Sequence, residues 1–171
     1  MKFTGLNCRR LQDIAKKLKI HALKIMVPFY VYGMKSPLPT FTTHEEVMFF
    51  DTDIGGVVHN IAYLRMIETC RTKLATEKLG LDLKSMADTG LYPVVVRTEI
   101  DYRASATLGH KLTIHGKLES VEKVKFWCSF EIYAEGIEKC LITCRQALAM
   151  VQMPKARPQR LPAEWREKWA E

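Results

Sequence analysis

Two aspartates, two glycines and a histidine occur in one short segment, and their types and spacing point to chemistry. Asp51 and Asp53 flank a threonine, Gly55 and Gly56 follow, and His59 comes three residues later. A carboxylate can attack an electrophilic carbon directly or activate water as a general base. From the residues alone, Asp53 is either a catalytic carboxylate or an Asx-turn residue at a helix entry, and both interpretations stay open. We interpret Asp51 as a side chain that orders the loop.

A long helix is predicted directly after this loop. The helix is expected to run from about Asn60 to Leu79 and to stop at Gly80. Apolar side chains recur within it at three- and four-residue spacing: Tyr63, Leu64, Ile67, Cys70, Leu74 and Ala75. Backbone N–H groups at a helix N-terminus carry partial positive charge and suit an oxyanion. The N–H groups near His59 and Asn60 are therefore candidates for polarising a carbonyl. Asn60 is equally a candidate for the helix N-cap.

Strand-like segments make up most of the remaining body. They are rich in β-branched and aromatic residues and lie at 43–50 and at about 92–103, 111–122, 124–134 and 138–152. In the fourth segment, alternation places one set of side chains on a common face: Val124, Phe126, Cys128, Phe130 and Ile132. Turns at 108–110 and 134–136 are short, which favours an antiparallel sheet. The long helix must bury its apolar stripe against that sheet, so the pattern predicts an α+β domain.

The net charge of +7 belongs to the first part of the chain. Residues 1–40 hold eight Lys and Arg and one acid, whereas residues 41–171 hold 18 basic and 18 acidic residues. A neutral body without interleaved basic and aromatic residues argues against a nucleic-acid-binding module. We predict a basic N-terminal extension at 1–40, the main domain at 41–153, and a tail at 154–171. Two tryptophans four residues apart predict a short helix in that tail or a contact with another subunit.

Residues 8–27 have the pattern of an amphipathic helix with interleaved lysines. No apolar run is long enough to span a bilayer, and lysines interrupt the segment that a secretory signal would need. Three interpretations of the extension stay open: a membrane-surface or partner-binding helix, an organelle transit peptide, and an upstream piece that the active protein does not need. We favour the last, because Pro37 and Pro39 form a stiff break and Met34 offers an alternative start.

The cysteines predict free thiols in a reducing cytoplasm. Their number is odd and no pair has the Cys-x-x-Cys spacing of a zinc or redox site: Cys8, Cys70, Cys128, Cys140 and Cys144. The histidines show no metal-ligand spacing either. We expect a cytoplasmic protein.

The catalytic-type loop and the start of the helix together resemble a known family signature. The segment from Phe50 to Val58, followed by Asn60 and Tyr63-Leu64-Arg65, resembles that of the 4-hydroxybenzoyl-CoA thioesterase-like family of the hotdog superfamily. Glu68 and Arg71 fit the helix that follows. Residues 101–112 resemble the family's Tyr-containing strand end and small-residue turn, so the likeness covers about 42–152. It implies a hotdog fold, in which a curved antiparallel sheet wraps around a long central α-helix.

The same resemblance implies an activity and a site. An acyl-CoA thioesterase is expected, with Asp53 as nucleophile or general base and with His59 and Asn60 as further catalytic positions. The positions implied in substrate binding are Gly55, Gly56, Val57, Val58 and Tyr63. Family members use thioesters of coenzyme A or of acyl carrier protein, need no metal or redox cofactor, and form homodimers or homotetramers with active sites at subunit interfaces.

One departure from the family pattern motivates a second hypothesis. Many relatives have an aromatic residue followed by His after the two glycines, whereas here His59 comes first and Asn60 follows. A hotdog protein that binds acyl-CoA or acyl carrier protein without hydrolysing it is therefore the alternative. A hotdog dehydratase or hydratase would need a differently placed His–acid pair, which we do not find. The acyl chain is not predicted by the sequence.

Overall fold

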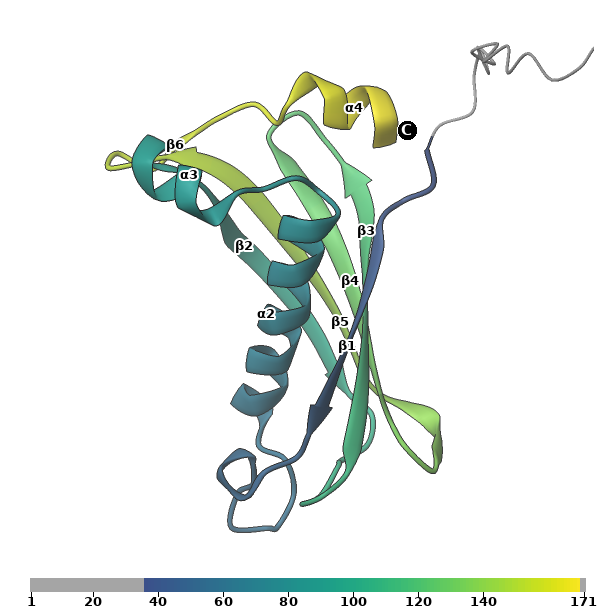
Figure 1. Ribbon diagram of the computed structural model, residues 1–171. Helices are drawn as coiled ribbons and strands as arrows, with labels where there is room; N and C mark the ends of the chain where they lie inside the picture. The colour runs from purple at the N-terminus through teal and green to yellow at the C-terminus, as the bar shows by residue number, and fades with distance from the viewer. Residues whose placement is uncertain (1–35, 170–171) are drawn as a thin grey trace, which may run out of the picture. The chain divides into compact units, whose positions relative to one another are not determined.

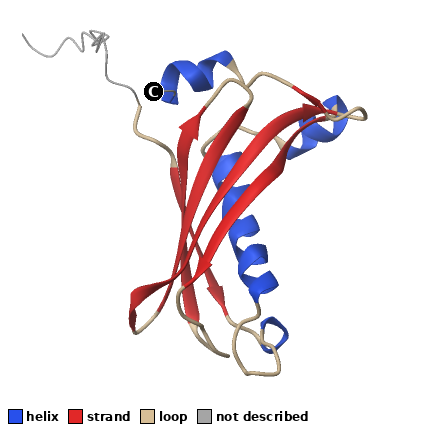
Figure 2. Ribbon diagram, turned by 180° about the vertical axis from the view of Figure 1, so that it is seen from behind, coloured by secondary structure: helices blue, strands red, loops and turns tan. Residues whose placement is uncertain are grey.

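The computed structural model of the chain describes residues 36–169. The predicted helix at 8–27 lies outside these residues, so all three interpretations of the extension stay predictions. Within residues 36–169, the long helix α2 (Asn60–Glu77) packs against one face of a curled antiparallel sheet, as Figure 1 shows. Figure 2 shows the same sheet from behind, with α2 on its far side. This arrangement confirms the predicted α+β fold class.

Five long strands and one short strand form the sheet. The long strands lie in the order β1-β3-β4-β5-β2, and each neighbouring pair is antiparallel; their bounds are β1 (Thr40–Glu46), β2 (Leu91–Tyr102), β3 (Lys111–Val121), β4 (Lys125–Ala134) and β5 (Ile137–Gln152). The short strand β6 (Arg157–Pro158) pairs with the end of β5. The four predicted downstream strands are confirmed, and β1 and β2 form the two edges of the main sheet.

The first strand differs from the prediction. A strand is predicted at 43–50, whereas β1 ends at Glu46 and the chain turns into the short 3-10 helix η1 (Phe49–Asp51). The Met48 N–H donates to Asp51 Oδ2 at 3.0 Å, and the Asp51 N–H donates to the Met48 carbonyl at 3.0 Å. Because these bonds satisfy the backbone of Met48 locally, the strand stops before the apolar run ends.

The core lies between α2 and the concave face of the sheet. The helix buries four residues of the predicted stripe, Tyr63, Ile67, Cys70 and Leu74, whereas Leu64 and Ala75 are half-buried. It also buries Ala62 and Met66, which the prediction left out. Strand β4 buries the predicted alternate residues Phe126, Cys128, Phe130 and Ile132. The placement of Val124 with them was wrong, because it is exposed in the β3–β4 turn. There the Glu122 N–H donates to the Lys125 carbonyl at 2.8 Å and closes the turn before the strand begins.

The tail closes one end of this core. Helix α4 (Ala163–Trp169) places the Trp165 ring 5.3 Å from the Phe126 ring and 5.7 Å from the Trp169 ring, measured between centroids. Trp165 is only 2% exposed. The Leu161 N–H also donates to the Lys123 carbonyl at 2.9 Å, which ties the tail to the β3–β4 turn. The predicted short helix that packs two tryptophans is confirmed.

A second short helix, α3 (Leu83–Thr89), connects α2 to β2. Asp82 caps its first turn through the Lys84 N–H, and Gly90 ends it in the left-handed region at φ 67°. The helical turn predicted at 81–90 is confirmed. All four cysteines in residues 36–169 are free thiols, as predicted: Cys70, Cys128, Cys140 and Cys144. Among the described helices, none has the length and apolar content needed to cross a membrane.

A glycine in β3 marks the tightest contact between α2 and the sheet. A Cβ atom at Gly116 would lie 2.8 Å from Cys70 Sγ and 3.1 Å from Phe130 Cε1. We therefore expect Gly116→Ala to lower the free energy of unfolding by about 1–3 kcal/mol, because the methyl group overpacks the core. Urea unfolding followed by circular dichroism measures the change.

The double variant Gly116→Ala/Cys70→Ala tests whether the clash with the Cys70 sulfur causes this destabilisation. Removing the sulfur makes room for the new methyl group, so the two substitutions together should cost less than the sum of the two alone. Strict additivity would show that contact with the Cys70 sulfur is not the source of the destabilisation.

Candidate active site

The loop between β1 and α2 is organised around a buried carboxylate, Asp51. This residue is 2% exposed. Its Oδ2 accepts the Met48 N–H, and its Oδ1 accepts from Arg65 Nη2 at 3.2 Å. Its backbone carbonyl accepts the N–H of His59 at 2.9 Å. Asp51 therefore joins the end of η1 to the start of α2, which is the loop-ordering role that the sequence predicts.

Asp53 lies at the exposed tip of the loop. Its Oδ1 accepts the Gly55 N–H at 2.8 Å, and its carbonyl accepts the Gly56 N–H at 2.9 Å. Its own N–H donates to the Val57 carbonyl at 2.9 Å. In residues 36–169 nothing donates a hydrogen bond to Oδ2. The Asx-turn geometry and a free carboxylate oxygen therefore occur in the same side chain.

The two glycines permit this tight turn. Gly56 has φ 72°, a left-handed conformation that other residues rarely adopt. At Gly55, a Cβ atom would lie 3.1 Å from Asp53 Oδ1. The glycines thus allow the backbone to wrap around the Asp53 carboxylate and hold it in place.

The N-cap of α2 is His59, not Asn60. His59 Nδ1 accepts the Ala62 N–H at 3.2 Å, and the His59 carbonyl accepts the same N–H at 3.0 Å. Because His59 occupies the cap one residue early, Asn60 becomes the first residue of the helix.

The helix start leaves two backbone donors free. The N–H of His59 is occupied by the Asp51 carbonyl, and the N–H of Ala62 by His59 itself. Within the described part of the chain, the N–H groups of Asn60 and Ile61 have no acceptor. Unsatisfied N–H groups in the first turn of a helix carry its partial positive charge and can bind an anionic oxygen.

The remaining predicted positions support the loop from behind. Tyr63 is buried, and its hydroxyl accepts the Ala106 N–H at 2.9 Å; burial raises the pKa of this phenol. Val58 is buried and its N–H donates to the Ala106 carbonyl at 2.9 Å. Val57 is half-buried and forms an isolated β-bridge with Thr107. These contacts fasten the loop and the start of α2 to Ala106 and Thr107.

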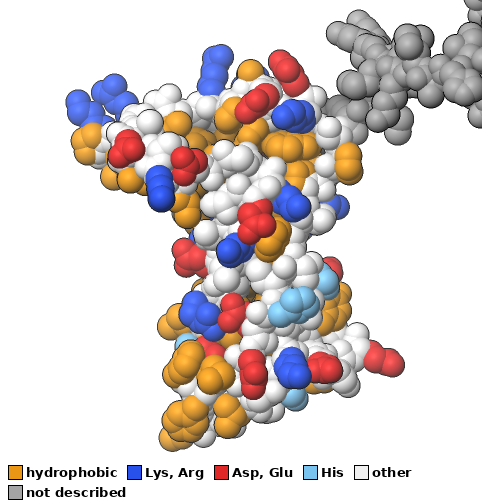
Figure 3. Space-filling model, viewed as in Figure 1, with side chains coloured by type: hydrophobic (Ala, Val, Ile, Leu, Met, Phe, Trp, Pro, Cys, Tyr) orange, Lys and Arg blue, Asp and Glu red, His pale blue; other side chains and the backbone are white. Residues whose placement is uncertain are grey.

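Apolar side chains surround the loop on its outer side. Figure 3 shows hydrophobic side chains gathered at the lower end of the molecule, where this loop lies; the exposed ones include Met48, Phe49, Phe50, Ile54 and Ile61. A monomeric protein rarely exposes so many large apolar groups together. The surface around Asp53 therefore has the character of a contact surface.

Sequence reasoning missed the ion pairs that hold the loop. Arg65 contacts both Asp51 and Glu45, the latter at 3.5 Å, and so links α2 to β1. Arg65 lies in the quoted family signature, and its position one turn into the helix was the available signal. Among the described residues, no three His, Cys, Asp or Glu side chains are grouped so that they could hold a metal ion.

Comparison with known proteins places this chain in a family. A profile described as the thioesterase-like superfamily matches residues 47–169, which include the loop, α2 and every later element. The 1,4-dihydroxy-2-naphthoyl-CoA hydrolase of Synechocystis sp. is 28% identical over 128 residues. That match covers 74% of this chain and 91% of the relative.

Solved structures show the same fold. A 1,4-dihydroxy-2-naphthoyl-CoA thioesterase from Synechocystis superimposes with a TM-score of 0.67 at 24% identity, covering 75% of this chain and 94% of that one. A DHNA-CoA thioesterase from Staphylococcus aureus gives 0.68 at 22% identity, covering 75% and 87%. At these identities the likeness establishes the fold, and it confirms the predicted hotdog architecture.

The cap geometry leads to a test of His59. We expect His59→Ala to lower the free energy of unfolding by about 1 kcal/mol, because the Ala62 N–H loses its side-chain acceptor. His59→Asn should restore most of that loss, since asparagine is a favoured N-cap residue. Thermal unfolding of the three proteins measures the difference. Equal stability of the Ala and Asn variants would contradict a capping role.

Proposed function

The chain belongs to the thioesterase-like superfamily and is a thioester hydrolase of hotdog fold, and from this premise we propose that it hydrolyses an acyl-CoA to a free acid and CoA. One observation carries the proposal. The Asp53 carboxylate is held by its own loop with Oδ2 free, and the same loop leads directly into the free N–H groups of α2. A carboxylate and an oxyanion site are the two groups that thioester hydrolysis needs.

We propose that Asp53 supplies the attacking oxygen. As a general base, Oδ2 takes a proton from water while the water oxygen bonds to the thioester carbon; the C–S bond then breaks, and the thiolate of CoA is protonated. As a nucleophile, Oδ2 bonds to that carbon itself, the C–S bond breaks, and the thiolate of CoA leaves and is protonated; water then hydrolyses the mixed anhydride to the free acid and the Asp53 carboxylate. Both routes use the same free oxygen, and the Gly55 N–H holds the other oxygen fixed.

The N–H groups of Asn60 and Ile61 are the proposed oxyanion donors. As the tetrahedral centre forms, negative charge develops on the former carbonyl oxygen, and preorganised donors at a helix start stabilise it without reorganisation. His59 and Asn60 were both predicted as catalytic. We propose that Asn60 acts through its backbone, and that His59 acts as a positioning residue, since its Nδ1 already accepts from Ala62.

The other predicted positions divide between substrate contact and support. Gly55, Gly56 and Val57 lie on the loop where a thioester would pass, and we propose that they contact it. We propose that Val58 and Tyr63 are positioning residues, because both are buried and both bind the backbone of Ala106. The names of the relatives point to a coenzyme A thioester as the substrate class.

We further propose that the enzyme acts as a homodimer or as a pair of such dimers. Two features support this assembly. Strand β2 is an edge of the sheet with exposed Val95 and Val96 at its middle, and an unpaired edge is prone to pair with another strand. The apolar side chains around Asp53 also need a cover, which a second copy would provide.

Replacing Asp53 tests the catalytic proposal. We expect Asp53→Asn and Asp53→Ala to lower kcat for acyl-CoA hydrolysis by roughly 10²–10⁴-fold, because the group that attacks or deprotonates water is lost. Release of free thiol from a panel of short, long and aromatic acyl-CoA substrates measures it. Asp88→Asn is a suitable control, because Asp88 is an exposed carboxylate of α3 without a hydrogen bond among the described residues.

Two outcomes would overturn the assignment. Full activity of both Asp53 variants would remove this residue from the chemistry. Tight binding of acyl-CoA without thiol release by the wild type would instead favour the alternative of a non-catalytic acyl-CoA or acyl-carrier-protein binding protein.

Disrupting the β2 edge tests the proposed assembly. We expect Val96→Glu to shift the protein toward monomers and to lower activity in parallel, because a buried unpaired carboxylate would oppose strand pairing. Sedimentation equilibrium gives the mass and thiol release gives the activity. Val124→Glu, at an exposed valine in the β3–β4 turn, is the matched control. A monomeric wild type with full activity would refute the assembly.

A further inference from the structure

The tail and the turn between β3 and β4 share one end of the domain, at the top of Figure 1. The Gln159 N–H donates to the Met150 carbonyl at 2.8 Å, and the Leu161 N–H donates to the Lys123 carbonyl at 2.9 Å. Because these bonds hold the tail beside the turn, the two segments form one surface. We call it the tail surface and define it by its two segments, 122–125 and 153–161.

Basic side chains without acidic partners gather on the tail surface. Lys125 is paired there, with Glu122 at 3.3 Å. The other four Lys and Arg side chains are exposed, and within residues 36–169 none of them forms an ion pair: Lys123, Lys155, Arg157 and Arg160. Figure 3 shows Lys and Arg side chains along this upper end of the molecule. Their charges are therefore available to an anionic partner.

The tail surface concentrates positive charge in a body that is otherwise acidic. Residues 41–171 hold 18 basic and 18 acidic residues, and five of the basic ones but only one of the acidic ones belong to the tail surface. The rest of the body then has 13 basic and 17 acidic residues. An extended anionic surface would attract the tail surface and repel the remainder, so this charge separation favours one orientation of approach.

The basic N-terminal extension joins the domain at the same end. The Leu118 N–H donates to the Pro39 carbonyl at 2.9 Å, three residues before β3 ends at Val121 and the β3–β4 turn begins. The preceding residues, 1–35, hold eight Lys and Arg and one Asp in the sequence. Because the chain is continuous, this second group of positive charges is attached beside the first.

Apolar side chains stand among the basic ones on the tail surface. Met153 is 44% exposed and Val124 is 36% exposed. The Met153 N–H donates to the Gly90 carbonyl at 2.8 Å, which holds the start of the tail in place. Cations beside exposed apolar groups suit the boundary of a lipid bilayer, where phosphates meet the cations and apolar groups enter between head groups. The backbone of a nucleic acid offers Met153 and Val124 no such environment.

We propose that the tail surface docks on an anionic phospholipid bilayer. Its unpaired basic side chains bind the head-group phosphates, and Met153 and Val124 enter between the head groups. The Asp53 loop lies at the other end of α2, whose 18 residues span about 27 Å. In a docked chain this loop therefore faces away from the lipid. Docking does not depend on the reaction proposed at Asp53.

Binding of the full-length protein to lipid vesicles tests the proposal. One set of vesicles is phosphatidylcholine alone, and the other contains about one-third phosphatidylglycerol, an anionic lipid. Co-sedimentation should show binding to the anionic vesicles that is at least roughly ten-fold tighter than to the neutral ones. Added salt should weaken it, because ions screen the attraction between exposed charges.

A matched pair of double variants tests the surface itself. Arg157→Gln/Arg160→Gln should weaken binding to the anionic vesicles at least roughly ten-fold, because two phosphate-binding cations are lost. Lys111→Gln/Lys139→Gln removes the same charge from exposed positions at the other end of the sheet, where β3 and β5 begin, and should leave binding within about two-fold of the wild type. Thermal unfolding of each variant confirms that it is folded before the binding measurement.

Three results of the vesicle measurements would overturn the proposal. Equal binding to anionic and neutral vesicles would remove the electrostatic basis. Equal losses in the two double variants would show that only net charge matters. Binding by Arg157→Gln/Arg160→Gln at the wild-type level would show that the tail surface is not the part that docks.

Other measurements separate docking from the hydrolysis site and from other partners. Asp53→Asn should bind vesicles as the wild type does, whether or not Asp53 is catalytic. A raised KM for acyl-CoA in Arg157→Gln/Arg160→Gln, with vesicle binding unchanged, would assign these cations to the phosphates of CoA instead. Loss of acyl-carrier-protein binding in that variant, with no vesicle binding by the wild type, would assign the surface to an acidic protein. Either result would show that the bilayer is the wrong partner.

Discussion

The buried carboxylate of Asp51 holds together the part of the molecule in which chemistry is proposed. It binds the Met48 N–H on the strand side and Arg65 on the helix side, while its carbonyl receives the His59 N–H. A buried carboxylate is unfavourable unless it is paired and hydrogen-bonded, so these bonds stabilise the closed loop. Arg65 is about half exposed, so the backbone bonds matter more here than the ion pair.

The placement of Asp53 follows from that closure. Two residues beyond Asp51, at Asp53, the chain reaches the exposed tip of the loop, and it must turn back to begin α2 at Asn60, seven residues later. Only a tight turn does this, and Gly56 supplies the left-handed conformation that it needs. The turn wraps around Asp53, whose Oδ1 satisfies the Gly55 N–H. One oxygen of this carboxylate thus holds the turn, and the other is the one proposed for the chemistry.

The sequence predicted the elements well and their ends less well. The stripe of α2 and the alternation of β4 depend on periodicity, which is local. The end of β1 and the position of the helix cap depend on hydrogen bonds that periodicity does not reveal. Met48 is apolar, yet it leaves the strand because Asp51 binds its N–H, and His59 takes the cap that Asn60 equally fits.

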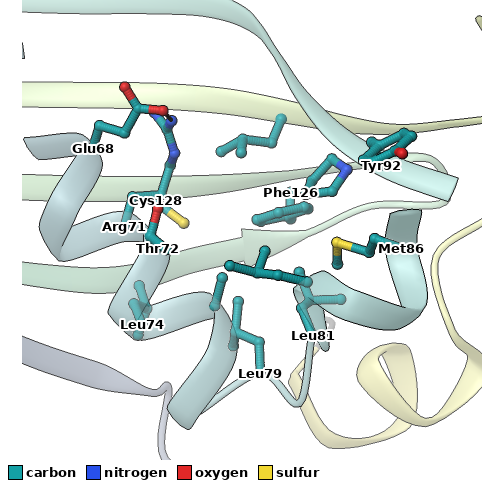
Figure 4. Close-up of a pocket in the computed structure, with 14 residues that line it drawn as sticks. Glu68, Arg71, Thr72, Leu74, Leu79, Leu81, Met86, Tyr92, Phe126 and Cys128 are labelled. Atoms are coloured by element: carbon teal, nitrogen blue, oxygen red, sulfur yellow. Dashed lines mark ion pairs between the residues drawn. The ribbon is translucent and has the colours of Figure 1, made fainter. Parts of the chain in front are cut away.

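A cavity of about 180 Å³ lies beside Arg71 between α2, α3 and the sheet (Figure 4), and it was beyond sequence reasoning for a different reason. Its polar wall joins Arg71 of α2 to Gln146 of β5 and Thr98 of β2, residues that are distant in the chain. Leu74 and Leu79 belong to the same apolar stripe whether the space beside them is filled or empty. Only the packing of three elements against one another determines that a hollow remains, and no pattern within one element carries that information.

A carboxylate exposed to water is a weak catalyst by itself, so a site built on Asp53 needs a surface that excludes water. The proposed hydrogen bonds from the Asn60 and Ile61 N–H groups to a developing oxyanion would be strong only where water is excluded, because bulk water screens them. In one chain the loop is open on its outer side, and its neighbours there are Phe49, Phe50 and Ile54 rather than polar groups. Apolar side chains around a charged group exclude water from it only when another surface packs against them. The groups proposed for the chemistry and the surface that would exclude water from them therefore lie in the same loop and in the helix start that follows it. This arrangement favours a site whose last wall comes from outside the chain.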